Sequence, residues 1–261
     1  MGKTLRYIKY KLTSRHKKGY GIHSPFVYGL IRNIFMNKNK IKDYTLIENY
    51  IQEVKSSQLK INVNDLGAGS RKLNTRQRRI SSIAKTAGTK QKYGKLLYRL
   101  AKEYGKNDIV ELGTSLGIGT MYLALGSGMA NIHTLEGCTE TYSYAKQSIE
   151  KKGITNVSFY NTEFEEGLEL LLEDQKIIPD LIFIDGNHRY EKTLQYFNYI
   201  KKYIHNDTII IFDDINWSED MHNAWKEIQQ DKKVSVSIDI FQWGIVSCRK
   251  EQTKQHFVIK F

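Results

Sequence analysis

Cysteine is scarce in this chain of 261 residues, which contains only Cys138 and Cys248. Two cysteines are too few for a disulfide framework, and their spacing does not match a metal-binding motif. We therefore expect two packed thiols. With 40% hydrophobic residues the chain can bury a full core, and its length predicts one domain with an extension.

Long apolar runs are also absent from the sequence. No run approaches the roughly 18 apolar residues that predict a membrane-spanning helix. The lysine-rich start of the chain lacks the apolar core and the cleavage site of a signal peptide. We therefore expect a cytoplasmic protein without a transmembrane segment.

Acidic residues are missing from two long stretches of a chain whose net charge is +12. Residues 1–40 contain ten Lys and Arg residues and no acid, and residues 66–102 contain eleven and no acid. This one-sided charge predicts an acidic partner, such as nucleic acid, an anionic membrane surface or a phosphorylated substrate. A solvated, lysine-rich surface explains the same charge equally well, so charge alone names no substrate.

The stretch most informative about function is residues 108–120, with the sequence DIVELGTSLGIGT. Ile109, Val110 and Leu112 predict a short buried strand, and three glycines then form a turn before a helix. The spacing differs from the G-x-G-x-x-G dinucleotide motif and from the G-x-x-x-x-G-K-[ST] triphosphate loop, so a bound phosphate is not expected. Glu111, two residues before the first glycine, instead suits a ligand that carries an ammonium group.

This acid-x-Gly-x-x-x-Gly pattern resembles the first motif of the class I S-adenosylmethionine-dependent methyltransferases. The resemblance implies that the glycine turn wraps the methionyl part of the cofactor and that Glu136, which closes the next strand, binds the ribose hydroxyls. It further implies that Glu163, or alternatively Asn161, binds the adenine amino group. Tyr93 would lie near the carboxylate end of the cofactor. The cofactor residues implied in this way are Glu111, Gly113, Thr114, Gly117, Gly119, Glu136, Glu163, Asp185 and Tyr93.

Apolar strands alternate with helical segments from residue 108 onward, which predicts a parallel sheet with helices on both faces. The last two segments are joined too tightly for a crossover helix and therefore predict an antiparallel hairpin. The order resembles the seven-stranded, doubly wound α/β sheet of the methyltransferases, a Rossmann-like fold that binds ligands at the carboxyl ends of its strands. The expected strands are 108–112, 131–135, 156–160, 180–185, 207–212, 234–241 and 243–248, with 257–261 as a further edge strand.

Residues 1–95 predict a basic, mainly helical extension, followed by the methyltransferase domain over residues 96–261. Ser24 and Pro25 predict the start of a helix that ends near residue 35. Further helices are expected over 41–60 and 80–103. The basic loop 63–79 is expected to be a lid over the active site.

Residues 1–20 have a weak amphipathic pattern. Leu5, Ile8, Tyr10 and Leu12 are interspersed with basic residues. This pattern is compatible with a surface helix, a membrane-contacting arm or a disordered tail.

Carboxylates follow the fourth and fifth predicted strands. Asp185 ends one strand, and Asp213 and Asp214 end its neighbour, so three carboxylates are expected in one crevice and must be neutralised. A divalent ion with oxygen ligands would do so, and Mg²⁺ is the first candidate. The layout resembles the metal-dependent O-methyltransferases that act on catechols, acyl-CoA phenols and macrolide or aminocoumarin sugars.

This resemblance implies that the ion chelates two vicinal substrate oxygens and lowers the pKa of the attacking one. His188 lies three residues after Asp185, the offset at which the sugar enzymes carry a base. We therefore predict Asp185, Asp213 and Asp214 as metal ligands, and His188 and Asp185 as catalytic residues. The structural alternative is that Asp185 caps a helix, Asp213 and Asp214 are loop carboxylates, and His188 is a surface residue.

Three functions are compatible with these features. The first is Mg²⁺-assisted O-methylation of a small molecule or glycan, with the basic front half as substrate lid and dimer surface. The second is RNA methylation, in which the basic residues of the N-terminal half would bind the RNA phosphates. The third is a non-catalytic cofactor-binding module. With only Pro25 and Pro179 the chain lacks the Asn-Pro-Pro-aromatic motif of amine methylation, which weakens that chemistry.

Overall fold

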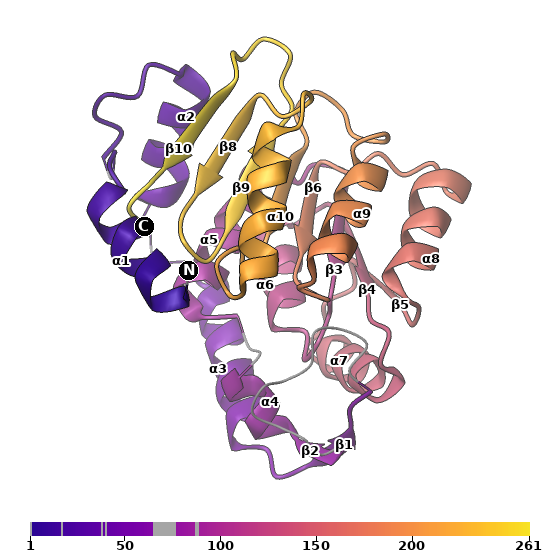
Figure 1. The fold of residues 1–261 in the computed structure, drawn as a ribbon. Coiled ribbons are helices and arrows are strands. Elements are labelled where there is room, and N and C mark those ends of the chain that lie inside the picture. Colours follow the sequence, from indigo (N-terminus) through magenta and orange to yellow (C-terminus); the bar gives the residue numbers. More distant parts are fainter. Residues whose placement is uncertain (1, 17, 38, 40, 65–76, 87–88) are drawn as a thin grey trace. The chain divides into compact units, whose positions relative to one another are not determined.

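The computed structural model describes residues 2–16, 18–37, 39, 41–64, 77–86 and 89–261. The chain divides into two units, and Figure 1 labels their helices and strands. Unit 1 contains Met1–Lys38 and Asp180–Phe261, and unit 2 contains Asn39–Pro179. The predicted extension, residues 1–95, thus contributes to both units.

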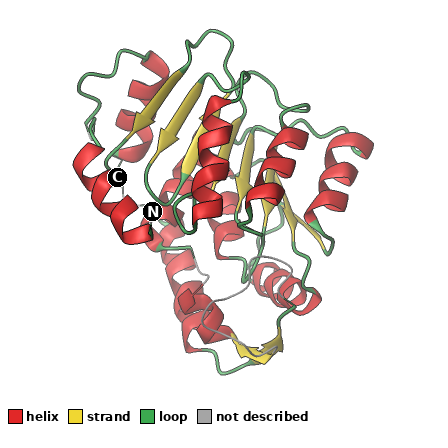
Figure 2. Cartoon of the chain, in the orientation of Figure 1, coloured by secondary structure: helices red, strands yellow, loops and turns green. Residues whose placement is uncertain are grey.

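The glycine motif lies in unit 2, at the end of the first of three parallel strands. These are β3 (Asp108–Leu112), β4 (Asn131–Leu135) and β5 (Val157–Tyr160), which pair in that order. Helices follow each strand, as the alternating sequence pattern predicts (Figure 2). They are α6 (Ile118–Ser127), α7 (Thr139–Lys151), α8 (Phe164–Glu169) and the π-helix η2 (Leu170–Asp174).

The segment before β3 supplies the other helices of unit 2. They are α3 (Asp43–Ser56), α4 (Ile80–Thr86) and α5 (Gln91–Tyr104). The helix predicted over 41–60 ends early because Lys60–Asn62 forms β1, which pairs with β2 (Gln77–Arg79) in an antiparallel ladder. The helix predicted over 80–103 is two helices. Most of the predicted lid loop, residues 65–76, lies outside the described residues.

Helices α5 and α6 pack closely because each presents a glycine to the other. A Cβ on Gly94 of α5 would lie 2.1 Å from Cε2 of Tyr122 on α6. A Cβ on Gly126 of α6 would lie 2.4 Å from the backbone oxygen of Tyr98 on α5. No larger side chain fits at either crossing without displacement. This packing fixes the helix that carries Tyr93 against the helix that follows the glycine turn.

Unit 1 contains the remaining strands of the mixed sheet, in the order β10-β8-β9-β7-β6. Strands β6 and β7 are parallel, β9 is antiparallel to both β7 and β8, and β10 is parallel to β8. The strands are β6 (Leu181–Ile184), β7 (Ile209–Phe212), β8 (Val236–Asp239), β9 (Gly244–Ser247) and β10 (Gln255–Val258). Helices α9 (Tyr190–Ile200) and α10 (Glu219–Gln230) pack side by side.

The doubly wound α/β class and the antiparallel hairpin are confirmed. Among the described residues, the two units together supply the seven predicted strands and the predicted edge strand, which lies at 255–258 instead of 257–261. No helix in the described part of the chain has the length and apolar character needed to span a bilayer.

The first residues of unit 1 are helical. They form α1 (Lys3–Thr13), α2 (Pro25–Gly29) and the π-helix η1 (Leu30–Phe35). Ser24 caps α2 as predicted, because its Oγ accepts a hydrogen bond from the backbone N–H of Val27 at 3.3 Å. Of the alternatives for residues 1–20, a helix is observed over most of the segment.

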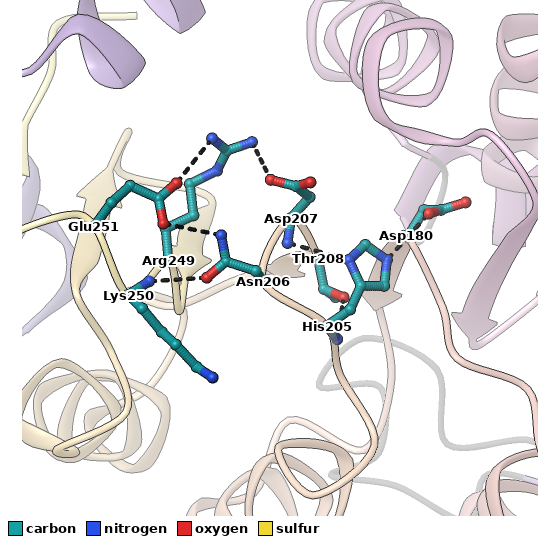
Figure 3. A network of polar contacts seen from close by, with 8 residues as sticks. All are labelled: Asp180, His205, Asn206, Asp207, Thr208, Arg249, Lys250 and Glu251. Carbon is teal, nitrogen blue, oxygen red and sulfur yellow. Dashed lines mark hydrogen bonds and ion pairs between the residues drawn. The ribbon is translucent and has the colours of Figure 1, made fainter.

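A polar network fixes the amino ends of β6 and β7 in unit 1 (Figure 3). The buried Asp180, next to β6, pairs with His205 at 3.1 Å. Asp207, next to β7, pairs with Arg249 at 2.6 Å. Because parallel strands share one direction, this network lies at the end of these strands opposite to Asp185 and Asp213. It stabilises the strands without entering the predicted site.

Candidate functional site

The predicted cofactor residues of unit 2 are arranged around the carboxylate of Glu111, on β3. Its side chain is 1% exposed. Its Oε2 accepts hydrogen bonds from Thr120 Oγ1 at 2.5 Å and from Thr134 Oγ1 at 2.7 Å. The hydroxyl oxygens of Thr114 and Thr134 are 2.6 Å apart. Because Thr134 gives its single proton to Glu111, Thr114 is the donor in that contact. The three threonines therefore form one hydrogen-bonded cluster with Glu111.

The pKa of Glu111 is well above its ordinary value. Burial raises it to about 7, the hydrogen bonds from Thr120 and Thr134 oppose that rise, and the charge of Glu136 adds to it. A carboxyl group with this pKa is ionised by a cation that binds nearby. The cluster is therefore suited to a positively charged ligand.

The turn after β3 requires glycine at two positions. Gly113 has a φ of 104° and Gly117 a φ of 76°, a region that side-chain-bearing residues rarely adopt. The backbone N–H groups of Gly113 and Thr114 donate to the oxygen of Leu135 at 3.0 and 3.2 Å. These bonds fix the turn to the end of β4. Gly119 is buried in the first turn of α6.

Glu136 lies directly after β4 and connects that strand to the glycine turn. One carboxylate oxygen accepts a hydrogen bond from the backbone N–H of Ser115, and the other from that of Cys138, each at 2.9 Å. A carboxylate oxygen can accept more than one hydrogen bond. The geometry is compatible with ribose binding, which stays a prediction.

The two candidates for adenine binding differ in their contacts. Asn161 donates from Nδ2 to the backbone oxygen of Glu136 at 2.8 Å and accepts from Thr139 Oγ1 at 2.9 Å. Glu163 is exposed at the start of α8 and makes no side-chain cap there. Asn161 therefore joins the ends of β4 and β5, whereas the Glu163 carboxylate faces solvent. The choice between them stays a prediction.

Tyr93 lies in the first turn of α5 and is half-buried. Its backbone N–H donates to the oxygen of Lys90 at 2.9 Å. The neighbouring Gly94 packs against Tyr122, so the position of Tyr93 relative to α6 is fixed within unit 2. Its predicted place near the cofactor's carboxylate stays a prediction.

The predicted catalytic residues lie in unit 1, at the carboxyl ends of β6 and β7. The two strands pair with Ile184 opposite Phe212. The backbone N–H of Asp213 donates to the oxygen of Ile184 at 2.9 Å. Asp185 and Asp213 are therefore at the same edge of the sheet, as the strand order predicts.

The predicted Mg²⁺ ligands Asp185, Asp213 and Asp214 are not assembled into a metal site. Within the described ranges, no three His, Cys, Asp or Glu side chains are grouped so that they could hold a metal ion. The buried Asp213 instead accepts hydrogen bonds at Oδ1 from the backbone N–H of Asp214 (2.6 Å) and from Gln242 Nε2 (3.2 Å). Local donors thus compensate its charge, and the residues as arranged do not fit the predicted ion.

His188 lies in a strained loop after β6. Asn187 and His188 have φ values of 65° and 45°, and Asp214 in the loop after β7 has a φ of 52°. Such backbone outliers concentrate at functional sites. His188 Nε2 is 3.7 Å from Asp185 Oδ1, which is ion-pair range and longer than a hydrogen bond. Its Nδ1 is buried and has no hydrogen-bond partner in the described part of the chain.

Three polar residues of these sites were not predicted, namely Thr120, Thr134 and Gln242. Thr134 is opposite Glu111 in the ladder between β3 and β4. The signal that could have identified Thr134 in the sequence is a threonine inside an apolar strand, in register with an acid on the neighbouring strand. Gln242 has no comparable signal, because its contact with Asp213 joins residues 29 positions apart.

The family model for a methyltransferase domain matches residues 110–215. This segment contains Glu111, the glycine turn, Asp185, His188 and the Asp213–Asp214 loop. An uncharacterized protein, R132, of Acanthamoeba polyphaga mimivirus is 24% identical over 172 residues, covering 60% of this chain and 76% of that protein.

Two solved structures share the fold at low sequence identity. The O-methyltransferase TomG from Streptomyces achromogenes, in complex with SAM, has a TM-score of 0.55 and 16% identity, covering 63% of this chain and 82% of TomG. The O-methyltransferase from Bacillus cereus, in complex with SAH, has a TM-score of 0.56 and 20% identity, covering 82% of this chain and 94% of that enzyme. The family model matches residues 110–215 as a methyltransferase domain, and the solved structures show that the chain has the fold of class I methyltransferases.

Proposed function

We propose that the chain transfers a methyl group from S-adenosylmethionine to a hydroxyl oxygen of a small molecule or glycan. The observation that carries the proposal is the buried Glu111 carboxylate, which accepts hydrogen bonds from Thr120 and Thr134 beside a turn that requires glycine. A negative group suits the ammonium of a methionyl moiety and disfavours phosphate. The SAM and SAH complexes of the two O-methyltransferases with this fold support the same donor.

The donor would be held by residues of unit 2. Glu111 would compensate the positive charge of the methionyl part, and the backbone of the turn from Gly113 to Gly117 would enclose it. Glu136, which the backbone N–H groups of Ser115 and Cys138 hold at the end of β4, would accept hydrogen bonds from the ribose hydroxyls. When bound, S-adenosylmethionine supplies an electrophilic methyl carbon on a sulfonium.

The proton of the acceptor hydroxyl would go to His188. The ring lies beside Asp185, with Nε2 3.7 Å from Oδ1, and a neutral imidazole has a lone pair that can accept this proton. The acceptor oxygen then forms its bond to the methyl carbon as the carbon–sulfur bond breaks. A general base with a pKa near neutrality assists this displacement. No step is assigned to Mg²⁺, because the described carboxylates do not form a metal site.

The two alternatives have weaker support. RNA methylation rests on the charge of residues 1–40 and 66–102 alone. A non-catalytic cofactor-binding module would need the Glu111 cluster but gives no role to the strained loop that carries His188.

Labelled methyl transfer tests the proposal. The full chain is incubated with methyl-labelled S-adenosylmethionine and with separate small-molecule, glycan and RNA fractions of a cell extract. We expect label in a small-molecule or glycan fraction, and none with the His188→Ala variant. Label confined to RNA would establish the RNA alternative. Binding of S-adenosylmethionine without transfer to any fraction would establish the non-catalytic one.

A further inference from the structure

Helix α1 contacts the rest of unit 1 through the face that carries its buried residues. Arg6 and Tyr10 are buried on that face. Tyr10 donates from its hydroxyl to the oxygen of Ile259 at 2.7 Å and accepts a hydrogen bond from the backbone N–H of Phe261 at 3.0 Å. Arg6 Nη2 donates to the oxygen of Asn216 at 3.2 Å. These contacts hold the helix against the C-terminal part of unit 1.

The other face of α1 is apolar and exposed. Leu5 is 58% exposed, Ile8 49% and Leu12 79%. Residues three and four positions apart lie on the same side of a helix, so the three side chains form one stripe. A single exposed apolar residue is ordinary, but a row of them on a helix fixed in this way marks an interaction surface.

The charged residues of α1 itself and of the segment just after it are all basic. Lys9 and Lys11 are exposed on the same helix, and Arg15 is exposed just beyond it. Residues 1–40 contain no acid that could neutralise them. A partner surface for α1 must therefore accept apolar side chains and supply negative charge.

We propose that α1 docks on an anionic membrane surface, with Leu5, Ile8 and Leu12 inserted below the headgroups and the lysines facing lipid phosphates. A basic amphipathic helix binds in the plane of such an interface through buried apolar area and charge attraction. A second copy of the chain fits less well, because a two-fold contact would bring two acid-free stretches together. The inference does not depend on the proposed function.

Vesicle sedimentation of the full chain tests the proposal. The probes are vesicles of phosphatidylcholine alone, and of phosphatidylcholine and phosphatidylglycerol in equal parts. We expect binding to the mixed vesicles that decreases with added salt, and little binding to the neutral ones. The triple variant Leu5→Ser, Ile8→Ser, Leu12→Ser should bind the mixed vesicles at least ~10-fold more weakly. The double variant Lys9→Gln, Lys11→Gln should lose roughly tenfold or more at low salt.

The matched control replaces exposed apolar residues elsewhere. Met129 is 89% exposed and Ile178 57%, and both lie in unit 2. The variant Met129→Ser, Ile178→Ser should bind the mixed vesicles as the unchanged chain does. Circular dichroism and cofactor titration show whether each variant is folded. Equal binding by the triple variant and the control would overturn the proposal.

Light scattering without lipid distinguishes membrane docking from self-association of the chain. We expect the unchanged chain and the triple variant to have the same oligomeric state. A dimer that the triple variant converts to a monomer would overturn the proposal in favour of self-association. Absence of binding to the mixed vesicles at low salt would overturn it as well.

Discussion

Units 1 and 2 hold their predicted functional residues in different ways. In unit 2, Glu111 and Glu136 are connected to threonine hydroxyls and backbone N–H groups by hydrogen bonds of 2.5 to 2.9 Å. In unit 1, Asp185 and His188 are 3.7 Å apart in a loop with left-handed backbone. A site that always binds the same methyl donor benefits from such rigidity. The residues that select the acceptor are expected in loops, because loops usually determine specificity. Variants in unit 2 should therefore impair cofactor binding, and variants in unit 1 should impair turnover.

The largest effect is expected from His188→Ala. Loss of a general base costs roughly 10²-fold or more in kcat. The dissociation constant of S-adenosylmethionine should not change, because the proposed donor site lies in unit 2. Turnover is measured with the acceptor found by label transfer, and binding by calorimetry. If His188→Ala also lost cofactor affinity, the assignment of cofactor binding to unit 2 and turnover to unit 1 would be wrong.

Glu111→Gln should act in the opposite way. Removing one charged partner of a buried interaction costs about 1.5–3 kcal/mol, which is roughly a 10- to 100-fold loss of cofactor affinity. At saturating cofactor, kcat should remain close to that of the unchanged chain. Thr134→Val, which removes one hydrogen bond to the same carboxylate, is the milder companion variant. Unchanged affinity in both variants would remove Glu111 from the cofactor site.

The pH dependence of cofactor affinity should follow Glu111. Its pKa is about 7 in the free protein because the side chain is buried, and a bound cation favours the ionised form. Affinity should therefore rise as the pH increases through about 7, by roughly tenfold at most, and then level off. The Glu111→Gln variant should show a flat profile. An equally steep profile in that variant would assign the titration to another group.

Stability gives a second test of the same carboxyl group. Because folding raises the pKa of Glu111 from 4.5 to about 7, its contribution to the free energy of unfolding is full below 4.5 and is lost through pH 7. The Glu111→Gln variant should lose less stability between these pH values than the unchanged chain does. Urea unfolding at both pH values measures the difference.

Removal of divalent metal should have the smallest effect. The described carboxylates of unit 1 are not grouped as metal ligands, and Asp213 already accepts two hydrogen bonds at Oδ1. EDTA should therefore change turnover by less than about twofold. A large loss that Mg²⁺ restores would show that Asp185, Asp213 and Asp214 rearrange around an ion during turnover.

The sequence was sufficient for the features that depend on local pattern. Apolar strands such as Ile109 to Leu112, the glycines with positive φ and the Ser24 cap follow from short-range rules, and the structure contains all of them. The hydrogen-bond network was less accessible. The contact of Glu111 with Thr134 depends on strand register, and that of Asp213 with Gln242 on the return of a distant loop.

The metal prediction illustrates the same limit. Three acidic residues at neighbouring strand ends indicate a shared ion, because like charges repel. Whether they converge depends on the loop backbone. Here Asp214 has a left-handed backbone, and its N–H donates to the Asp213 carboxylate. Sequence spacing contains no information about that loop conformation.

Calorimetric titration of the full chain with S-adenosylmethionine, NAD and ATP tests the central claim most directly. The Glu111 cluster and its glycine turn predict saturable binding of S-adenosylmethionine, competition by S-adenosylhomocysteine, and no heat with the two phosphate-bearing nucleotides. Binding of NAD or ATP, or no binding of S-adenosylmethionine to the folded chain, would contradict the account.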